Sequence, residues 1–368
     1  MTALPENLPL NETPNWQPDL ASGSCPACKR QFLISQEMAG APCPICAQAG
    51  LALQPVRMRS EEPELYIANQ VSPEQATRIF GEFCAGVPFR TADLEPQNLL
   101  ARSQLLFWPC WLLDADLEGS WAAEMGFDYQ VKTAKEHLGG GSWQSQEHLR
   151  TQTRWEERRG AISRHYDNKL VVATAGHEQR TQRLGNYDLR GAHRFDPAKA
   201  QRMLVQLPDL QPDAVADLGK AALSKSAGAD CMLASGAQHR RGFVFTGAFE
   251  NQNWTQILLP MLSTWYRTDE GQMVPVTLNG QSGRIAGMRL ASMRKARKLA
   301  AWILVILLLI GLAAAWALGA LASAYELTNI LLPLICLGLP LVLGLAAVPL
   351  LWAGRWNAAQ KRQNEPLE

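Results

Sequence analysis

The sequence lacks the short motifs that mark the commonest kinds of catalytic site. It contains no Gly-x-x-x-x-Gly-Lys phosphate loop, no Gly-x-Ser-x-Gly nucleophile motif and no His-Glu-x-x-His metal motif. We therefore expect a protein without catalytic activity. An enzyme whose site assembles from distant segments only in three dimensions is an alternative that the sequence leaves open.

The first twenty residues lack lysine, arginine and any apolar stretch, and they hold prolines at positions 5, 9, 14 and 18. A secretory signal begins with basic residues followed by an apolar core, so no such signal is visible. Because it has little apolar surface to bury, the segment 1–22 is predicted to be a disordered leader. The amino terminus is expected in the cytoplasm.

Charge is almost absent from a long stretch near the end of the chain. Between Lys298 and Arg355 the only charged residue is Glu326. The apolar runs 299–325 and 330–354 each exceed the roughly 20 residues that cross a hydrocarbon core. We interpret them as two transmembrane helices, joined by a turn at Glu326 and the three residues after it. Two buried core helices of a soluble protein are the alternative.

Basic residues flank both apolar runs, whereas the turn between them carries none. From Gly271 to Lys298 the chain has no acidic residue, and the segment 355–368 adds three more bases. Because cytoplasmic flanks tend to be positive, we predict a membrane protein with both termini in the cytoplasm and a cytoplasmic tail at 355–368. A basic neck, residues 291–298, is expected to contact anionic lipid through Arg294, Lys295, Arg297 and Lys298.

Small residues recur at every fourth position along the first apolar run. The four are Gly311, Ala315, Gly319 and Ser323. Such a stripe lets helices approach closely in lipid. The stripe is expected either to pack against the second span or to support a homo-oligomer. Because alanine and glycine are abundant throughout this run, the four-residue spacing also has a chance explanation.

Four of the eight cysteines form two Cys-x-x-Cys pairs within the segment 23–57. They are Cys25, Cys28, Cys43 and Cys46. Four thiolates at this spacing close a tetrahedron around Zn²⁺, and disulfides are disfavoured in a reducing cytoplasm. The spacing predicts a zinc ribbon with a structural Zn²⁺, and iron is the main alternative. Since all four ligands come from the protein, no position is open for a substrate.

The ribbon offers little surface for a nucleic acid. Between its outer cysteines the only bases are Lys29 and Arg30, and the only aromatic residue is Phe32. Residues 1–270 hold 26 bases against 31 acids, so the body is mildly acidic, whereas nucleic-acid binders concentrate positive charge on the body. We therefore favour a protein partner for the ribbon over nucleic acid.

The rest of the chain predicts an α+β body at 72–290, preceded by a linker at 58–71. Ser72 is a capping residue followed by proline and, three positions on, by Gln75, which predicts a helix to about Cys84. Further helices are expected at about 196–206 and 213–225.

The strands of this body are predicted from aromatic and β-branched clusters between turns. From Leu105 onward the clusters predict short strands, whereas the polar, glycine-bearing segment 132–150 is expected to be more loop than strand. The clearest prediction is a meander at 261–268, 273–278 and 283–289, joined by Asp-Glu-Gly and Asn-Gly turns. We expect mostly antiparallel pairing.

Taken together, these motifs resemble a family. The double-knuckle ribbon is followed by Phe107-Trp108-Pro109-Cys110-Trp111-Leu112-Leu113-Asp114-Ala115-Asp116, and then by Tyr266, Gly271, Val274-Pro275-Val276, Asn279-Gly280-Gln281-Ser282-Gly283, Gly287 and the apolar segment. This pattern is similar to bacterial zinc-ribbon membrane proteins that are labelled TFIIB-type zinc-ribbon proteins or relatives of primosomal protein N′. The resemblance implies a bacterial inner-membrane protein and supplies no catalytic residues.

The sequence therefore predicts a membrane-anchored adaptor or scaffold that faces the cytoplasm and binds protein partners. A membrane-tethered nucleic-acid-binding protein is the first alternative to this interpretation. Salt-sensitive binding of DNA or RNA would favour that alternative.

Overall fold

The computed structural model describes residues 20–54, 62–139, 142–196, 204–321 and 324–364. The helices in these segments are α1 (Pro73–Cys84), α2 (Pro96–Ala101), α3 (His177–Leu184), α5 (Pro212–Ala234), α6 (Met293–Leu321) and α7 (Ala324–Asn364). The strands are β1 (Ala21–Ser24), β2 (Gln31–Ile34), β3 (Ala52–Leu53), β4 (Leu65–Ile67), β5 (Gln104–Gly139), β6 (Ser142–Val172), β7 (Ala192–Arg194), β8 (Leu204–Gln206), β9 (His239–Arg267), β10 (Met273–Asn279) and β11 (Ile285–Gly287). The chain is mixed α+β, with two apolar helices after the body.

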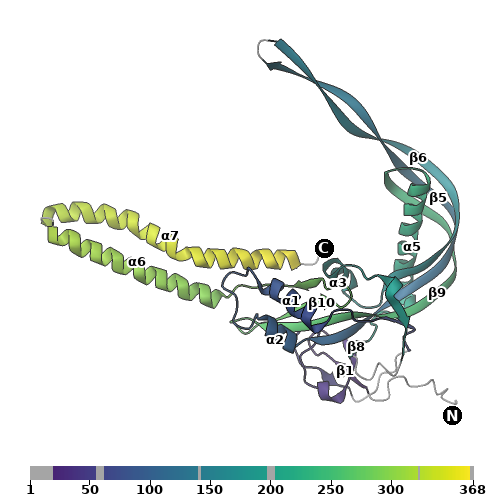
Figure 1. Ribbon diagram of the computed structural model, residues 1–368, viewed down its shortest axis with the longest axis horizontal. Coiled ribbons are helices and arrows are strands. Elements are labelled where there is room, and N and C mark those ends of the chain that lie inside the picture. Colours follow the sequence, from purple (N-terminus) through teal and green to yellow (C-terminus); the bar gives the residue numbers. More distant parts are fainter. Residues whose placement is uncertain (1–19, 55–61, 140–141, 197–203, 322–323, 365–368) are drawn as a thin grey trace, which may run out of the picture.

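The strands described form one sheet in the order β11-β10-β9-β5-β8-β2-β1-β3, with β6 beside β5, β4 beside β9 and β7 beside β4. The β4–β9 and β5–β8 pairs are parallel, and the other pairs are antiparallel. Three long strands, β5, β6 and β9, rise from the body as a curved sheet (Figure 1). Since β9 begins at His239, opposite Gly126, the ends of β5 and β6 continue as a two-stranded ribbon, called the β-arm below.

Glycines let tryptophan rings lie across neighbouring strands where the long sheet curves. Trp121 lies opposite Gly160, and Trp155 lies opposite Gly126. A Cβ added at Gly160 would lie 2.9 Å from Trp121 Nε1, and one added at Gly126 would lie 3.2 Å from Trp155 Cη2. The rings therefore occupy the space that a side chain would take, an arrangement that stabilises glycine at curved positions of a sheet.

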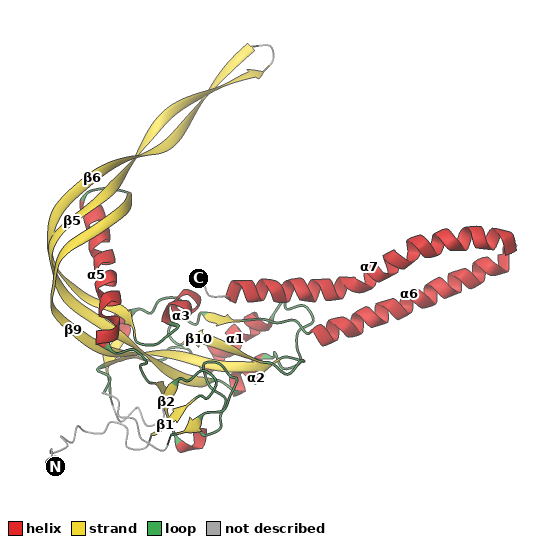
Figure 2. Cartoon of the chain, turned by 180° about the vertical axis from the view of Figure 1, so that it is seen from behind, coloured by secondary structure: helices red, strands yellow, loops and turns green. Residues whose placement is uncertain are grey.

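Helix α5 lies along the concave side of this curved sheet (Figure 2). Its buried side consists mostly of small residues: Val215, Gly219, Leu223, Ala227, Gly228 and Cys231. A Cβ added at Gly219 would lie 2.7 Å from Leu113 Cδ2 and 2.9 Å from Trp254 Cη2. Glycine thus brings the helix axis close enough for large residues of the sheet to pack against it.

The segment with the four cysteines is joined to the body by main-chain pairing. β2 pairs with β8, and β8 pairs with β5, so the cysteine segment extends the central sheet. The linker expected at 58–71 contains β4, which pairs with β7 and β9. Of the predicted leader, residues 1–19 lie outside the described part of the chain, and β1 already begins at Ala21.

Several predicted elements are confirmed near the ends of the body. Helix α1 starts at the capping box of Ser72 and Gln75 and ends at Cys84. The meander is present as the end of β9 followed by β10 and β11. Helix α5 covers the predicted helix 213–225 and is longer at both ends.

Three expectations about local structure are wrong. The segment 132–150, expected as loop, is strand up to Gly139 and again from Ser142, and the short strands after Leu105 are one long strand. Because none of the described side chains of the β-arm, at 127–134 and 148–154, is buried on either face, its sequence lacks the alternation that marks a half-buried strand. The helix expected at 196–206 is also wrong at its end, where residues 204–206 form β8; residues 197–203 lie outside the described part.

The apolar segment forms two long antiparallel helices that project away from the body (Figure 1). Both are long and apolar enough to cross a membrane, and only 6% and 17% of their most apolar windows are buried. The turn expected from Glu326 onward is wrong, because α7 already begins at Ala324. The sequence carries the missed signal: Ser323 stands three residues before Glu326, the spacing of a capping box at a helix start.

Both helices are fixed to the body at the same end. Asn357 of α7 accepts a hydrogen bond from the Ala291 amide at 2.7 Å and donates one to the Ala291 carbonyl at 3.0 Å. Trp356 Nε1 donates to the carbonyl of Arg289 at 2.6 Å. Ala296 of α6 and Ala353 of α7 are buried in one cluster with Phe89 and Trp356.

Helix α6 starts at Ser292, whose hydroxyl accepts a hydrogen bond from the Lys295 amide at 3.0 Å and donates one to Asp269. The predicted neck, 291–298, is therefore largely the first turns of α6. Likewise, the predicted tail, 355–368, is helical up to Asn364.

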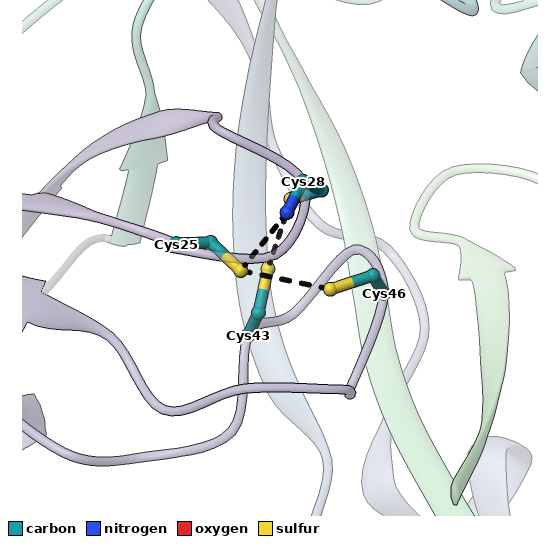
Figure 3. A group of neighbouring side chains, drawn as sticks. All are labelled: Cys25, Cys28, Cys43 and Cys46. Atoms are coloured by element: carbon teal, nitrogen blue, oxygen red, sulfur yellow. Dashed lines mark hydrogen bonds between the residues drawn. The ribbon is translucent and has the colours of Figure 1, made fainter.

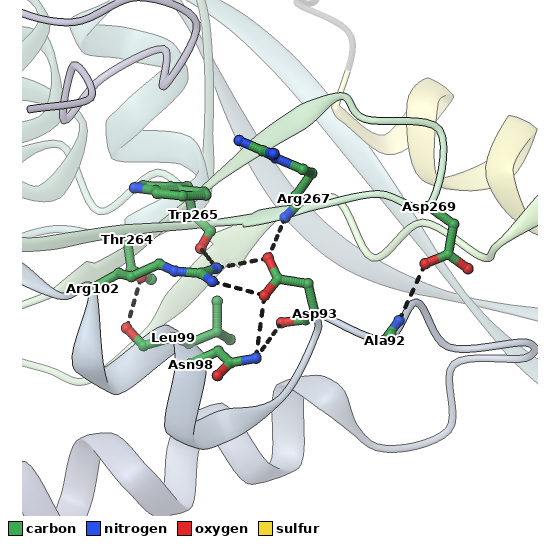
Figure 4. A network of polar contacts seen from close by, with 9 residues as sticks. All are labelled: Ala92, Asp93, Asn98, Leu99, Arg102, Thr264, Trp265, Arg267 and Asp269. Atoms are coloured by element: carbon green, nitrogen blue, oxygen red, sulfur yellow. Dashed lines mark hydrogen bonds and ion pairs between the residues drawn. The ribbon is translucent and has the colours of Figure 1, made fainter.

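A partly buried polar network ties α2 to the end of β9 near this attachment (Figure 4). Asp93 accepts two hydrogen bonds from the Arg102 guanidinium, at 2.6 and 2.8 Å, and one from the Arg267 amide at 2.6 Å. Burial opposes the charged form of Asp93, but these donors outweigh it and lower the pKa of its carboxyl. Arg102 also lies over the Trp265 ring, 4.3 Å from its centroid. The network thus joins the segment before α2, the end of α2 and the end of β9.

Candidate metal centre

The two cysteine pairs lie on loops with the same backbone geometry. Lys29 and Ala47, each the residue after the second cysteine of a pair, have positive φ angles of 61° and 55°. The Lys29 amide donates to the Cys25 carbonyl at 2.8 Å, and the Ala47 amide donates to the Cys43 carbonyl at 2.9 Å. Each loop is thus a tight turn that presents two sulfurs toward the other loop.

The four sulfur atoms lie together, within 4.8 Å of one another (Figure 3). Cys25 Sγ is 3.6 Å from Cys46 Sγ, and Cys28 Sγ is 3.7 Å from Cys43 Sγ. These separations are far longer than a disulfide bond of about 2.05 Å. They match the edge of a tetrahedron around a metal bound at about 2.3 Å, which is about 3.8 Å. The arrangement is therefore compatible with one metal ion bound by all four cysteines.

Main-chain amides point at the first sulfur of each pair. The Cys28 amide donates to Cys25 Sγ at 3.5 Å, and the Ile45 amide donates to Cys43 Sγ at 3.5 Å. Burial opposes the charged form of Cys25, but the amides of Cys28 and Ala27 outweigh it and hold the pKa of this thiol below its ordinary value. These amides favour thiolate, the form of cysteine that binds metal.

Two other thiols of the cluster, those of Cys28 and Cys43, have raised pKa values when no cation is bound. Burial raises the pKa of Cys28 to about 11, and the charge of Cys46 acts in the same direction. Burial also holds the pKa of Cys43 well above its ordinary range, although the amides of Cys46 and Ile45 oppose the shift. Four thiolates at such short separations repel one another, so a divalent cation is the group that stabilises them together.

The site is part of the main hydrophobic core. Cys25 and Cys43 are buried in one cluster with Phe32 of β2 and Trp108 of β5. The hydroxyl of Ser263 in β9 donates a hydrogen bond to the carbonyl of Pro44, inside the second knuckle. A change at the metal centre is thus transmitted directly to the central strands.

The structure places the predicted lipid-contacting bases on the first turns of α6. Arg294, Arg297 and Lys298 are exposed. Lys295 is also exposed, and its ammonium group donates to the carbonyl of Arg90 at 2.6 Å, which links α6 to the body.

The predicted small-residue stripe is described only in its first half. A Cβ added at Gly311 would meet no atom within 4 Å, so at this position the stripe does not seat the second span. Ala315 is half-buried, the surroundings of Gly319 are not described, and Ser323 lies outside the described residues.

A polar cluster on the convex side of the long sheet was not found from the sequence. His165 Nδ1 lies 2.6 Å from Asp116 and its Nε2 lies 2.8 Å from Asp167, while Asn251 donates to Asp116 at 2.7 Å. The carboxylate of Asp116, with a smaller contribution from Asp167, raises the pKa of His165. Strand register brings Asp116 and Asn251 to His165, and no local signal in the sequence encodes that register; Asp167 is only two residues from His165 in the chain.

Comparison with known proteins adds no relative. No protein-family model matches the chain, and no match was found among curated proteins or solved structures.

Proposed function

We propose that this protein is a membrane-anchored adaptor, in which a structural Zn²⁺ held by Cys25, Cys28, Cys43 and Cys46 stabilises a body that binds protein partners. Soft thiolate ligands in a tetrahedral set suit Zn²⁺. Since all four ligands come from the chain, the ion contributes folding free energy and leaves no open coordination position.

The observation that carries the membrane part of this proposal is the exposed helical hairpin. Large apolar side chains cover its surface, including Leu312 at 69% and Trp316 at 79% exposure. A surface of this kind is costly in water and is stabilised in a hydrocarbon core. Both helices contact the body at the same end of the hairpin, which supports placing the body and both termini on one side of the membrane. The basic flanks of the hairpin favour the cytoplasmic side.

The surroundings of the cysteine segment favour a protein partner over nucleic acid. Phe32 is fully buried and so is not available for base stacking. Arg30 donates to the carbonyl of Ala175 at 2.6 Å and pairs with Asp209 at 3.4 Å. Between the outer cysteines, all of whose residues are described, Lys29 then remains as the exposed base, which is little for phosphate binding.

The β-arm supports an adaptor role because it extends beyond the third strand and exposes Tyr129 and Leu149. A two-stranded ribbon is marginally stable alone in water, so a partner that packs on it would stabilise it. We also propose that the chain is a member of the bacterial zinc-ribbon membrane proteins. The ribbon, the body motifs and the apolar segment named in the sequence analysis support this membership.

Affinity purification of the tagged, detergent-solubilised protein, with and without nuclease, tests the proposal. We expect a defined set of proteins to co-purify in both samples. Recovery of nucleic acid, with loss of the co-purifying proteins after nuclease treatment, would refute the adaptor role and favour a membrane-tethered nucleic-acid binder. A variant lacking residues 127–154 should retain zinc and membrane attachment while losing proteins bound through the β-arm.

A further inference from the structure

An open cavity with a basic wall, about 660 Å³ in volume, lies where the last turns of α7 meet the body. Its lining comes from α1, the end of α3, the β11 region and α7. All of these lining residues belong to the described part of the chain, and they include three arginines against one carboxylate. The charged and amide residues of the lining are Arg183, Arg284, Arg289, Glu82, Gln360 and Gln363.

Two of these arginines are positioned by groups other than carboxylates. The Arg289 guanidinium lies against the rings of Phe83 and Trp356, 6.0 and 5.7 Å from their centroids. Arg284 is exposed and donates to the carbonyl of Gln182 at 3.5 Å. Within the described residues, no carboxylate lies at ion-pair distance from Arg284 or Arg289. Since a guanidinium has five N–H donors, both side chains keep donors for an anionic ligand.

Arg289 lies at the level where the apolar part of the hairpin ends. The uncharged run of α7 ends at Gly354, and Trp356, which Arg289 contacts, is two residues further along the helix. At 1.5 Å per residue this is about 3 Å beyond the apolar run. The headgroup layer extends about 5–7 Å beyond the hydrocarbon core, and tryptophan is favoured in that layer. In the proposed membrane orientation, the guanidinium therefore lies at the depth of the headgroups.

We propose that the cavity binds one anionic phospholipid, whose headgroup phosphate is held by Arg284 and Arg289. Guanidinium groups suit phosphate oxygens, and the cytoplasmic leaflet is rich in anionic lipid. Apolar side chains line the same cavity, namely Ile79, Phe83 and Ile285. A phospholipid has apolar parts that match this wall, whereas a free phosphate has none. The proposal rests on the membrane anchor, and it adds a site for one lipid molecule to the diffuse attraction of the exposed bases on α6.

Native mass spectrometry of the full-length protein in detergent, with dioctanoyl phosphatidylglycerol as the probe, tests this proposal. We expect one probe molecule per chain, at an occupancy several-fold above that of dioctanoyl phosphatidylcholine, whose headgroup is neutral overall. Arg284→Gln and Arg289→Gln should each lower the occupancy several-fold. Arg362→Gln is the matched control, because Arg362 is exposed on α7 between Gln360 and Gln363 but does not line the cavity. This variant should leave the occupancy unchanged.

Equal losses in all three variants would leave only diffuse attraction and would overturn the proposal. If Arg289→Gln fails to fold, Arg284→Gln decides, since the exposed Arg284 side chain is not part of the core. Displacement of the probe by an equal concentration of glycerol 3-phosphate would assign the cavity to a soluble phosphate ester and would also contradict a lipid site. A protein that stays in membranes during alkaline carbonate extraction but binds no probe would refute the lipid site alone, whereas release by carbonate would refute the anchor.

Discussion

At the scale of single residues, Cys43 links the four-cysteine cluster to the core most directly. It is nearly fully buried, its sulfur lies 3.7 Å from that of Cys28, and the carbonyl of its neighbour Pro44 is bound by Ser263 of the central sheet. An uncharged thiol or hydroxyl here leaves the other sulfurs without the cation that stabilises them as thiolates.

Replacing Cys43 with serine should therefore release the zinc and lower the free energy of unfolding of the body, by several kcal/mol, since metal binding in such sites is folding free energy. Metal content per chain and thermal unfolding measure the two effects. Cys84→Ser is the matched control, because Cys84 is equally buried but lies outside the cluster. One zinc per chain in the Cys43 variant would be incompatible with the assigned ligand set.

Metal binding should also release protons. Without metal, Cys28 has a pKa of about 11 and Cys43 has a raised pKa, so both thiols are protonated at pH 7. Zn²⁺ must displace both protons, and its affinity should therefore fall as the pH falls. Isothermal titration of the metal-free protein in buffers of different ionisation enthalpy measures the release. A binding heat that is the same in every buffer would argue against four thiolate ligands.

At the scale of elements, two helical glycines have opposite surroundings. Gly219 of α5 faces Leu113 and Trp254 at distances that leave no space for a side chain, whereas a Cβ at Gly81 of α1 would meet nothing within 4 Å. The same substitution should thus have opposite effects at the two positions.

We expect Gly219→Ala to destabilise the protein by about 1–3 kcal/mol, because the added carbon overpacks the contact between α5 and the sheet. Gly81→Ala should stabilise it by up to about 1 kcal/mol, since alanine is the better helix former. Denaturant unfolding of both variants measures the difference. A stabilising effect at Gly219 would show that α5 does not pack as closely as described.

Local signals in the sequence predicted some elements well and others poorly. The capping box at Ser72 and the Asn-Gly turn before Gly283 act over a few residues, so α1 and the meander could be predicted. The β-arm could not, because its strands are stabilised by pairing with each other rather than by burial of one face. The end of α6 at Leu321 was missed because the apolar composition continues beyond it, as far as Tyr325. Only the Ser-x-x-Glu spacing at 323–326 marks the start of the next helix.

At the scale of the whole molecule, the four-cysteine cluster was the most predictable feature and the architecture around it the least. Two Cys-x-x-Cys pairs have few alternative arrangements, so the cluster followed from spacing alone. In contrast, the strand order that joins β2 to β8 and β5 arises from pairings between segments more than sixty residues apart. Such long-range pairings leave no pattern in a single sequence.

The proposed topology, with the body and both termini on the cytoplasmic side, makes a prediction for the whole molecule. A reporter fused after Glu368 should behave as cytoplasmic, because α7 returns to the body at the end where α6 starts and the bases lie on these flanks. A reporter inserted at residue 323, between α6 and α7, should behave as periplasmic. The reverse pattern would overturn the proposed topology.

Extraction of membranes with alkaline carbonate tests the membrane-anchored account most directly. The full-length protein should remain in the membrane pellet, because two apolar helices that span the bilayer are not released when ionic and peripheral contacts are broken. A variant ending at Ser292 should appear in the supernatant. Release of the full-length protein into the supernatant would contradict the anchor and, with it, the proposal that this body works at a membrane.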